Sequence, residues 1–135
     1  MGTYSRMIAV LAGLLALGAA RAAAQAVHEI QMVADGEGEF RFVPASVSAR
    51  RGDVLLFKVV SGAPHSVVFE GKDMTAAARQ SLNAALPRRA GDLSSPLLTE
   101  KSEYRIVVPA LPAGTYRYFC LPHRAYDMRG ELLVK

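Results

Sequence analysis

Cysteine is almost absent from this chain of 135 residues, in which only Cys120 occurs. A lone cysteine cannot form an internal disulfide, so the thiol is either a buried, inert group or one employed in chemistry. Internal repeats and low-complexity tails are also absent, which excludes solenoid and repeat architectures. The length suits one domain and is too short for two.

No apolar run in the sequence reaches the ~20 residues that a membrane-spanning helix needs. The longest run, residues 7–20, follows Arg6 and precedes the alanine-rich residues 19–26, which offer small side chains for cleavage. We therefore predict a signal peptide over residues 1–24, cleaved within a few residues of that point, and one domain over residues 25–135. The mature protein is then exported, periplasmic or otherwise extracytoplasmic, and is not inserted in a membrane. An uncleaved anchor or a buried N-terminal helix is the alternative.

Positive charge is not concentrated in the predicted domain. The formal net charge of +4 falls to +2 without residues 1–24, which contain Arg6 and Arg21 and no acidic residue. Proteins that bind nucleic acid usually show a basic stripe or cluster, and interspersed signs provide neither. We therefore expect no nucleic-acid partner.

The sequence is rich in the two-residue alternation of apolar and polar side chains that is typical of β-strands. The alternating segments lie between turns that contain Gly or Pro, and they are residues 28–33, 40–43, 54–59, 66–69, 104–108, 115–120 and 131–134. Many short strands at close spacing are typical of a β-sandwich or small barrel. Residues 73–86 break the pattern: they are alanine-rich, begin at a possible N-cap, Asp73, and end before Pro87, which predicts a short helix. Residues 88–96 have the composition of a surface loop.

The strand over residues 115–120 places Cys120 beside a loop that carries further donor groups. Alternation puts Cys120 on the same, inward face as Tyr116 and Tyr118. The loop that follows has the spacing C-x2-H-x4-M, which supplies an imidazole from His123 and a thioether from Met128. A second imidazole, His65, stands far upstream at the start of another strand.

Two imidazoles, one thiolate and a weak axial thioether form the ligand set of blue-copper electron-transfer sites. Thiolate and thioether favour Cu(I), whereas imidazole serves both oxidation states. We therefore predict a metal site formed by His65, Cys120, His123 and Met128. Met128 is the residue for which simple core packing is the competing interpretation. Met32 and Met74 are predicted to pack in the core, and His28 to lie at the surface.

The ordered motifs resemble the plastocyanin/azurin family of cupredoxins over nearly all of the predicted domain except residues 73–96. The matching segments are FVP at residues 42–44, GDV at 52–54, PHSVVF at 64–69, GTYRYFCLPH at 114–123 and MRG at 128–130. The resemblance implies an all-β, Greek-key β-sandwich that binds one copper ion, Cu(I) or Cu(II), per chain. It carries the four ligands onto His65, Cys120, His123 and Met128. It also implies a tyrosine corner at Tyr116.

The sequence departs from this family at three positions near the predicted site. Ser66 stands where the family often has Asn, and a serine hydroxyl reaches less far to tether the two ligand loops. Phe119 replaces a Tyr of the plant plastocyanins, which disfavours their acidic docking mode. Asp127 stands where Gly is common before the axial Met, which changes the backbone freedom of the loop.

By this resemblance we expect a one-electron carrier, a monomer that meets a donor and an acceptor protein in transient complexes. The electron would leave through the imidazole edge of His123, with Leu121, Pro122 and Ala125 around it as an apolar docking surface. The alternative is a non-redox module for copper storage, copper delivery or binding. We expect no enzyme, because multicopper enzymes need further histidines and only His28 remains.

Overall fold

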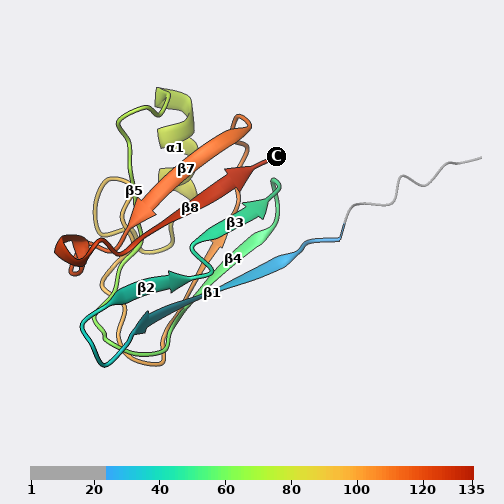
Figure 1. Ribbon diagram of the computed structural model, residues 1–135. Helices are drawn as coiled ribbons and strands as arrows, with labels where there is room; N and C mark the ends of the chain where they lie inside the picture. The colour runs from blue at the N-terminus through green and yellow to red at the C-terminus, as the bar shows by residue number, and fades with distance from the viewer. Residues whose placement is uncertain (1–23) are drawn as a thin grey trace, which may run out of the picture.

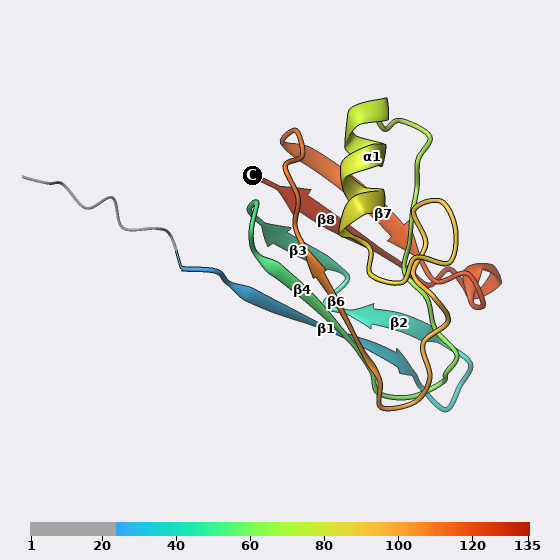
Figure 2. The same cartoon turned by 180° about the vertical axis from the view of Figure 1, so that it is seen from behind.

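The computed structural model describes residues 24–135, which form two four-stranded β-sheets packed as a sandwich (Figures 1 and 2). The predicted signal peptide, residues 1–24, therefore lies outside the described residues except for Ala24. In chain order the elements are β1 (Val27–Ala34), β2 (Phe40–Val43), β3 (Ser46–Ala49), β4 (Val54–Val59), β5 (Val68–Phe69), α1 (Ala76–Ala85), β6 (Glu103–Val107), β7 (Gly114–Phe119), a 3-10 turn (Arg124–Tyr126) and β8 (Arg129–Val134). The sheets have the strand orders β2-β1-β4-β6 and β3-β8-β7-β5.

The predicted Greek-key β-sandwich with a short helical insertion is confirmed, with two differences in the strands. β3 was not predicted, because four residues with two buried side chains give too short a pattern to recognise. β3 is held by parallel pairing with β8, a strand that is remote in sequence. The segment predicted as a strand over residues 66–69 is a strand only at Val68 and Phe69.

An aromatic cluster fills the space between the two sheets. Tyr118 of β7 lies edge-on to Phe42, Phe57 and Phe69, with ring centroids 4.9, 5.5 and 5.6 Å away. Each such pair adds about 0.5–1.5 kcal/mol beyond its apolar burial. The cluster therefore anchors β7 at the residue that lies two positions before Cys120.

The helix α1 lies against one side of the sandwich (Figure 2) and begins later than the sequence pattern indicated. Its N-cap is Thr75, not Asp73, because the hydroxyl of Thr75 accepts a hydrogen bond from the amide of Ala78 at 3.1 Å. A side-chain oxygen at this position satisfies an amide that has no partner within the helix. The helix buries Ala78 and Leu82 against the core.

The segment after α1, predicted as a surface loop over residues 88–96, is partly built into the core. Leu93 and Ser95 are both buried. The hydroxyl of Ser95 accepts from the amide of Val67 at 2.8 Å, and the amide of Ser95 donates to the carbonyl of Val67 at 2.9 Å. These bonds fasten the insertion to the chain just after His65.

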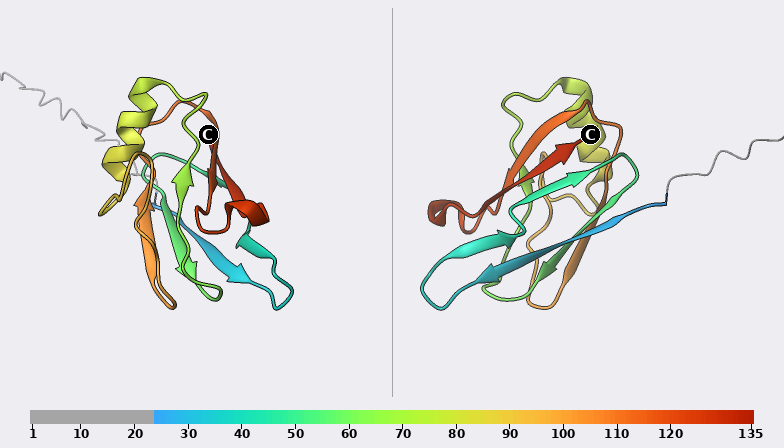
Figure 3. Two further views of the ribbon diagram at one scale, coloured as in Figure 1. Left: turned by 90° about the vertical axis from the view of Figure 1, so that its left-hand side faces the viewer. Right: turned by 45° about the vertical axis from the view of Figure 1, so that its right-hand side comes forward.

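The connections that bear the predicted ligands meet at one end of the sandwich. The connection between β4 and β5 carries His65, and the turn between β7 and β8 carries the other three predicted ligands; both lie at the end opposite the C-terminus (Figures 1 and 3). No helix among the described residues is long and apolar enough to cross a membrane.

Candidate metal centre

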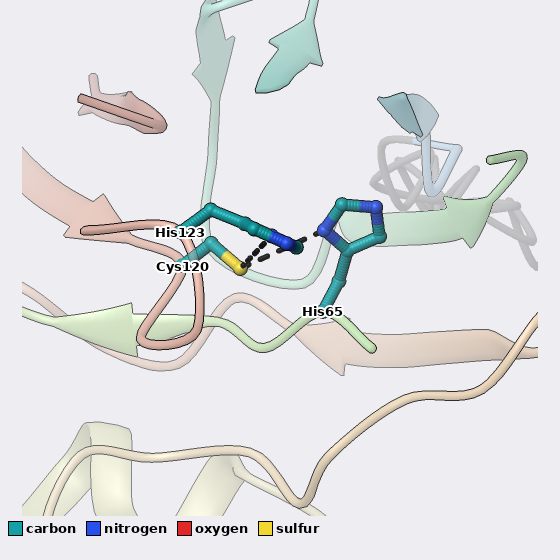
Figure 4. A group of neighbouring side chains, drawn as sticks. All are labelled: His65, Cys120 and His123. Carbon is teal, nitrogen blue, oxygen red and sulfur yellow. Dashed lines mark hydrogen bonds between the residues drawn. The ribbon is translucent and has the colours of Figure 1, made fainter. Parts of the chain in front are cut away.

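Three predicted donor atoms from two distant segments converge on one point (Figure 4). The Nδ1 atoms of His65 and His123 lie 3.6 and 3.4 Å from the Sγ atom of Cys120. The ligand atoms of all three residues lie within 4.8 Å of one another, and all three residues are buried. Within residues 24–135 this is the only such group of histidine, cysteine and acidic side chains.

Backbone hydrogen bonds close the loop from Cys120 to Met128 into a tight turn. The amide of Cys120 donates to the carbonyl of Met128 at 3.0 Å, and the amide of His123 donates to the carbonyl of Cys120 at 3.3 Å. Asp127 adopts the left-handed conformation (φ 58°, ψ 35°), which Asp tolerates better than most residues other than Gly. Asp127 thus adopts the left-handed conformation at the position where the family commonly has Gly.

Met128 is the last residue of this loop, and its side chain is fully buried. The carbonyl of Met128 accepts a hydrogen bond from the amide of Cys120, next to the paired strands β7 and β8. This bond sets the position of the Met128 backbone relative to the thiol. The loop thus keeps Met128 beside the three clustered residues. The role of its thioether as the axial ligand stays a prediction.

The orientation of His65 is set by hydrogen bonds on both its ring and its backbone. Its Nε2 lies 2.7 Å from the carbonyl oxygen of Ser61, so the Nε2–H donates and leaves the lone pair on Nδ1. Its backbone exchanges two hydrogen bonds with Leu98, at 3.0 and 2.8 Å. The lone pair of Nδ1 therefore faces the thiol of Cys120.

Ser66 joins the two ligand segments in spite of its short side chain. Its amide lies 3.4 Å from Sγ of Cys120, and its hydroxyl accepts a hydrogen bond from the amide of Leu121 at 2.9 Å. The shorter reach of serine, noted from the sequence, thus still allows a tether between the two ligand segments. The backbone of residues 65–66 lies close enough to the loop for one Oγ atom to span the gap.

Burial sets the protonation of all three clustered groups in the metal-free protein. Burial raises the pKa of the Cys120 thiol, against a smaller opposite effect of hydrogen bonds from Ser66 and His123. Burial also lowers the pKa of His65 and of His123. At neutral pH the cluster therefore holds a neutral thiol and two neutral imidazoles, and a metal ion bound by these residues would take the place of the thiol proton.

The donor set fits a soft or borderline transition metal. Thiolate suits Cu(I) and Zn, and imidazole suits Cu and Zn, whereas Mg and Ca require oxygen ligands. No carboxylate belongs to the described cluster. The cluster chemistry is therefore that of a copper or zinc site.

Comparison with known proteins distinguishes between these metals. The model of the plastocyanin/azurin family of copper-binding proteins matches residues 28–135. The chain belongs to this family. Its predicted cofactor, copper, is thereby confirmed.

Individual proteins resemble the chain over most of its length. Plastocyanin of the fern Dryopteris crassirhizoma is 30% identical over 103 residues, which cover 76% of this chain and 96% of the relative. The solved structure of its oxidised form aligns with a TM-score of 0.63 at 27% identity, over 80% of this chain and 100% of that one. Amicyanin from Paracoccus versutus shares the fold, with a TM-score of 0.52 at 21% identity over 84% of each chain.

The family resemblance also predicted a tyrosine corner, and this is confirmed. The hydroxyl of Tyr116 donates to the carbonyl of Pro112 at 2.7 Å. This bond locks the loop that leads into β7, the strand that ends at Cys120.

Two aromatic residues near the cluster were not identified from the sequence. The ring of Phe40, the first residue of β2, is stacked on the imidazole of His123, and the ring of Tyr126 lies beside it. In sequence Phe40 has the pattern of an ordinary strand residue and lies far from either ligand motif. No sequence signal marks it as part of the site.

Proposed function

We propose that this cupredoxin is a one-electron carrier whose copper is held by His65, Cys120, His123 and Met128. When bound, copper supplies the reversible Cu(I)/Cu(II) couple, with the thiolate as its strongest donor. The observation that carries the proposal is the buried convergence of two imidazole nitrogens on one cysteine sulfur.

The way in which the donors are held suits electron transfer. Hydrogen bonds from the backbone and from Ser66 hold Cys120, and a separate bond to Ser61 holds His65. Apart from Sγ of Cys120, none of the atoms in these bonds would bind copper, so the bonds would hold the ligands in place in either oxidation state. The site then needs little rearrangement when an electron arrives or leaves.

The surface near His123 suits brief contact with redox partners. His123 itself is 9% exposed, whereas Leu121 and Tyr126 in the same loop are 56% and 58% exposed. Apolar side chains beside a buried redox centre provide a small docking surface, and small interfaces favour rapid dissociation. We propose a monomer that meets a donor and an acceptor protein at this surface in an extracytoplasmic compartment.

A non-redox role in copper storage or delivery is the alternative. Such proteins favour open sites that release the ion readily. The buried cluster of His65, Cys120 and His123 favours retention instead. The family's electron carriers are a better match for this enclosed set of donors.

The copper-loaded protein provides the direct test. We expect purified mature protein with one equivalent of Cu(II) to turn intensely blue and to titrate reversibly with one electron. Cys120→Ser should abolish the colour. The matched control is His28→Gln, which removes the histidine outside the cluster and should leave the spectrum unchanged. A pale or colourless product from the unmodified protein would overturn the proposal in favour of storage or delivery.

A further inference from the structure

The chain from His65 onward lies between two other segments. On one side the backbone groups of His65 and Val67 form hydrogen bonds with residues 93–98. On the other side the amide of Ser66 lies 3.4 Å from Sγ of Cys120. Backbone groups of consecutive residues in an extended chain point to opposite sides. The bonds that hold His65 and Val67 therefore also decide where the amide between them points.

Ser95 makes the contact with Val67, and its side chain takes part in it. The amide of Ser95 donates to the carbonyl of Val67 at 2.9 Å. Its hydroxyl accepts from the amide of Val67 and donates to the carbonyl of Pro96, both at 2.8 Å. Ser95 is only 2% exposed, so without this hydroxyl the amide of Val67 would lose its partner in the interior. A side-chain oxygen thus holds Val67 where a regular strand would use a backbone carbonyl.

The stretch that carries Ser95 is itself held by the helix α1. In α1, Oδ1 of Asn83 accepts from the amide of Leu93 at 2.7 Å, and Nδ2 of Asn83 donates to Asp92 at 2.8 Å. The side chain of Leu93 is buried in the core, and its carbonyl accepts from the amide of Phe69 at 2.9 Å. The helical insertion therefore gives Ser95 a fixed position from which to hold the ligand segment.

We propose that Ser95 is a positioning residue for the metal site, which holds Val67 so that the amide of Ser66 stays aimed at Sγ of Cys120. This inference rests on the proposed copper-carrier function, since that amide affects copper only if Cys120 is a ligand. Hydrogen bonds to the sulfur tune the reduction potential of such sites. A bond from an amide draws charge from the thiolate and so favours Cu(I). The insertion, which lies outside the motifs shared with the family, thereby helps to set the potential.

Three substitutions separate this role from simple support of the fold. Ser95→Ala removes the hydroxyl and leaves the backbone bonds. Ser94→Ala is the matched control in the same stretch, because the hydroxyl of Ser94 donates to the carbonyl of its neighbour Ser95 at 3.0 Å. Tyr104→Phe is the control for a general loss of stability, because its hydroxyl donates to the carbonyl of Pro87 at 2.8 Å. Both controls thus lose a hydrogen bond outside residues 65–69.

The first measurement is the hydrogen exchange of backbone amides in the metal-free protein, followed by NMR. In Ser95→Ala we expect the amide of Ser66 to exchange about threefold to tenfold faster relative to the amides of β4, the factor that one hydrogen bond is worth. The ratio to β4 removes the effect of global stability, because global unfolding exposes all amides together. Ser94→Ala and Tyr104→Phe should leave this ratio unchanged.

The second measurement is the reduction potential of the copper-loaded protein in a redox titration. Ser95→Ala should lower the potential, because a looser bond from the amide of Ser66 leaves more charge on the thiolate and favours Cu(II). Ser94→Ala and Tyr104→Phe should keep the potential of the parent protein.

An unchanged exchange ratio for Ser66 in Ser95→Ala would overturn the inference, as would equal ratios in Ser95→Ala and Tyr104→Phe. A parental potential in Ser95→Ala would overturn it as well. The exchange measurement requires no metal, so it decides whether Ser95 holds the amide of Ser66 even if the parent protein fails to turn blue. Failure of the blue colour alone would refute the proposed function and not the contact made by Ser95.

Discussion

The hydroxyl of Ser66 accepts a hydrogen bond from the amide of Leu121, at 2.9 Å, and so joins two segments that are 55 residues apart in sequence. Ser66 follows His65 directly, and Leu121 follows Cys120. The bond therefore fixes the distance between the two parts of the metal site. A side chain shorter than the Asn common in the family makes this tether.

Removal of the tether should destabilise the protein. We expect Ser66→Ala to lower the free energy of unfolding by about 1 kcal/mol, because the amide of Leu121 loses its partner in a partly buried position. Urea unfolding of the metal-free protein measures this change. Ser48→Ala provides the control, since Ser48 is exposed and its substitution should shift the free energy by less than about 0.5 kcal/mol. Equal effects of the two substitutions would refute the tether.

Met128→Leu tests the axial ligand. Leucine preserves apolar volume but has no sulfur, so the protein should keep copper and its blue colour. The reduction potential should rise, because the weak axial donor that is lost stabilises Cu(II). A redox titration followed in the visible band measures the shift. Met74→Leu, at a partly buried methionine that packs against the core, should leave the potential unchanged. A Met128→Leu protein with an unchanged potential, or without copper, contradicts the axial role.

Two buried tyrosines should respond in opposite ways to loss of the hydroxyl. The hydroxyl of Tyr118 has no hydrogen-bond partner in the described structure, whereas that of Tyr104 donates to the carbonyl of Pro87 at 2.8 Å. Tyr118→Phe should therefore raise the free energy of unfolding by about 1 kcal/mol, and Tyr104→Phe should lower it by a similar amount. Chemical denaturation of both variants decides the point. A loss of stability in Tyr118→Phe would show that its hydroxyl is satisfied.

The metal-free protein should be most stable between the pKa values of its imidazoles and its thiol. Burial lowers the pKa of His65 and His123 below the ordinary 6.5, so the unfolded chain binds more protons and stability falls as pH drops below about 6.5. Burial raises the pKa of the Cys120 thiol above the ordinary 9.0, so stability also falls as pH rises through and beyond about 9.

Urea midpoints at pH 5, 7.5 and 9.5 measure this dependence. Cys120→Ser removes the thiol and should flatten the alkaline side only. A midpoint for the parent protein that is constant from pH 5 to 7.5 would contradict the burial of the two neutral imidazoles.

The sequence by itself determined the type of fold and the identity of the clustered residues. Alternation along 54–59 and 115–120 predicted strands that the structure confirms as β4 and β7 to within a residue. Cys120 and His123 share one short loop, so their closeness follows from chain geometry alone. The context of His65, Pro-His-Ser-Val-Val-Phe, identified it only through the family motif.

Tertiary structure alone decided how those residues are held. The tether from Ser66 and the stacked ring of Phe40 depend on contacts between segments that are far apart in sequence. No local sequence pattern in either segment indicates such a contact. β3 likewise exists because β8 pairs with it, and the short sequence 46–49 has too little periodicity to predict a strand. Local patterns report propensity and alternation, whereas the distance between remote segments is set by packing of the whole core.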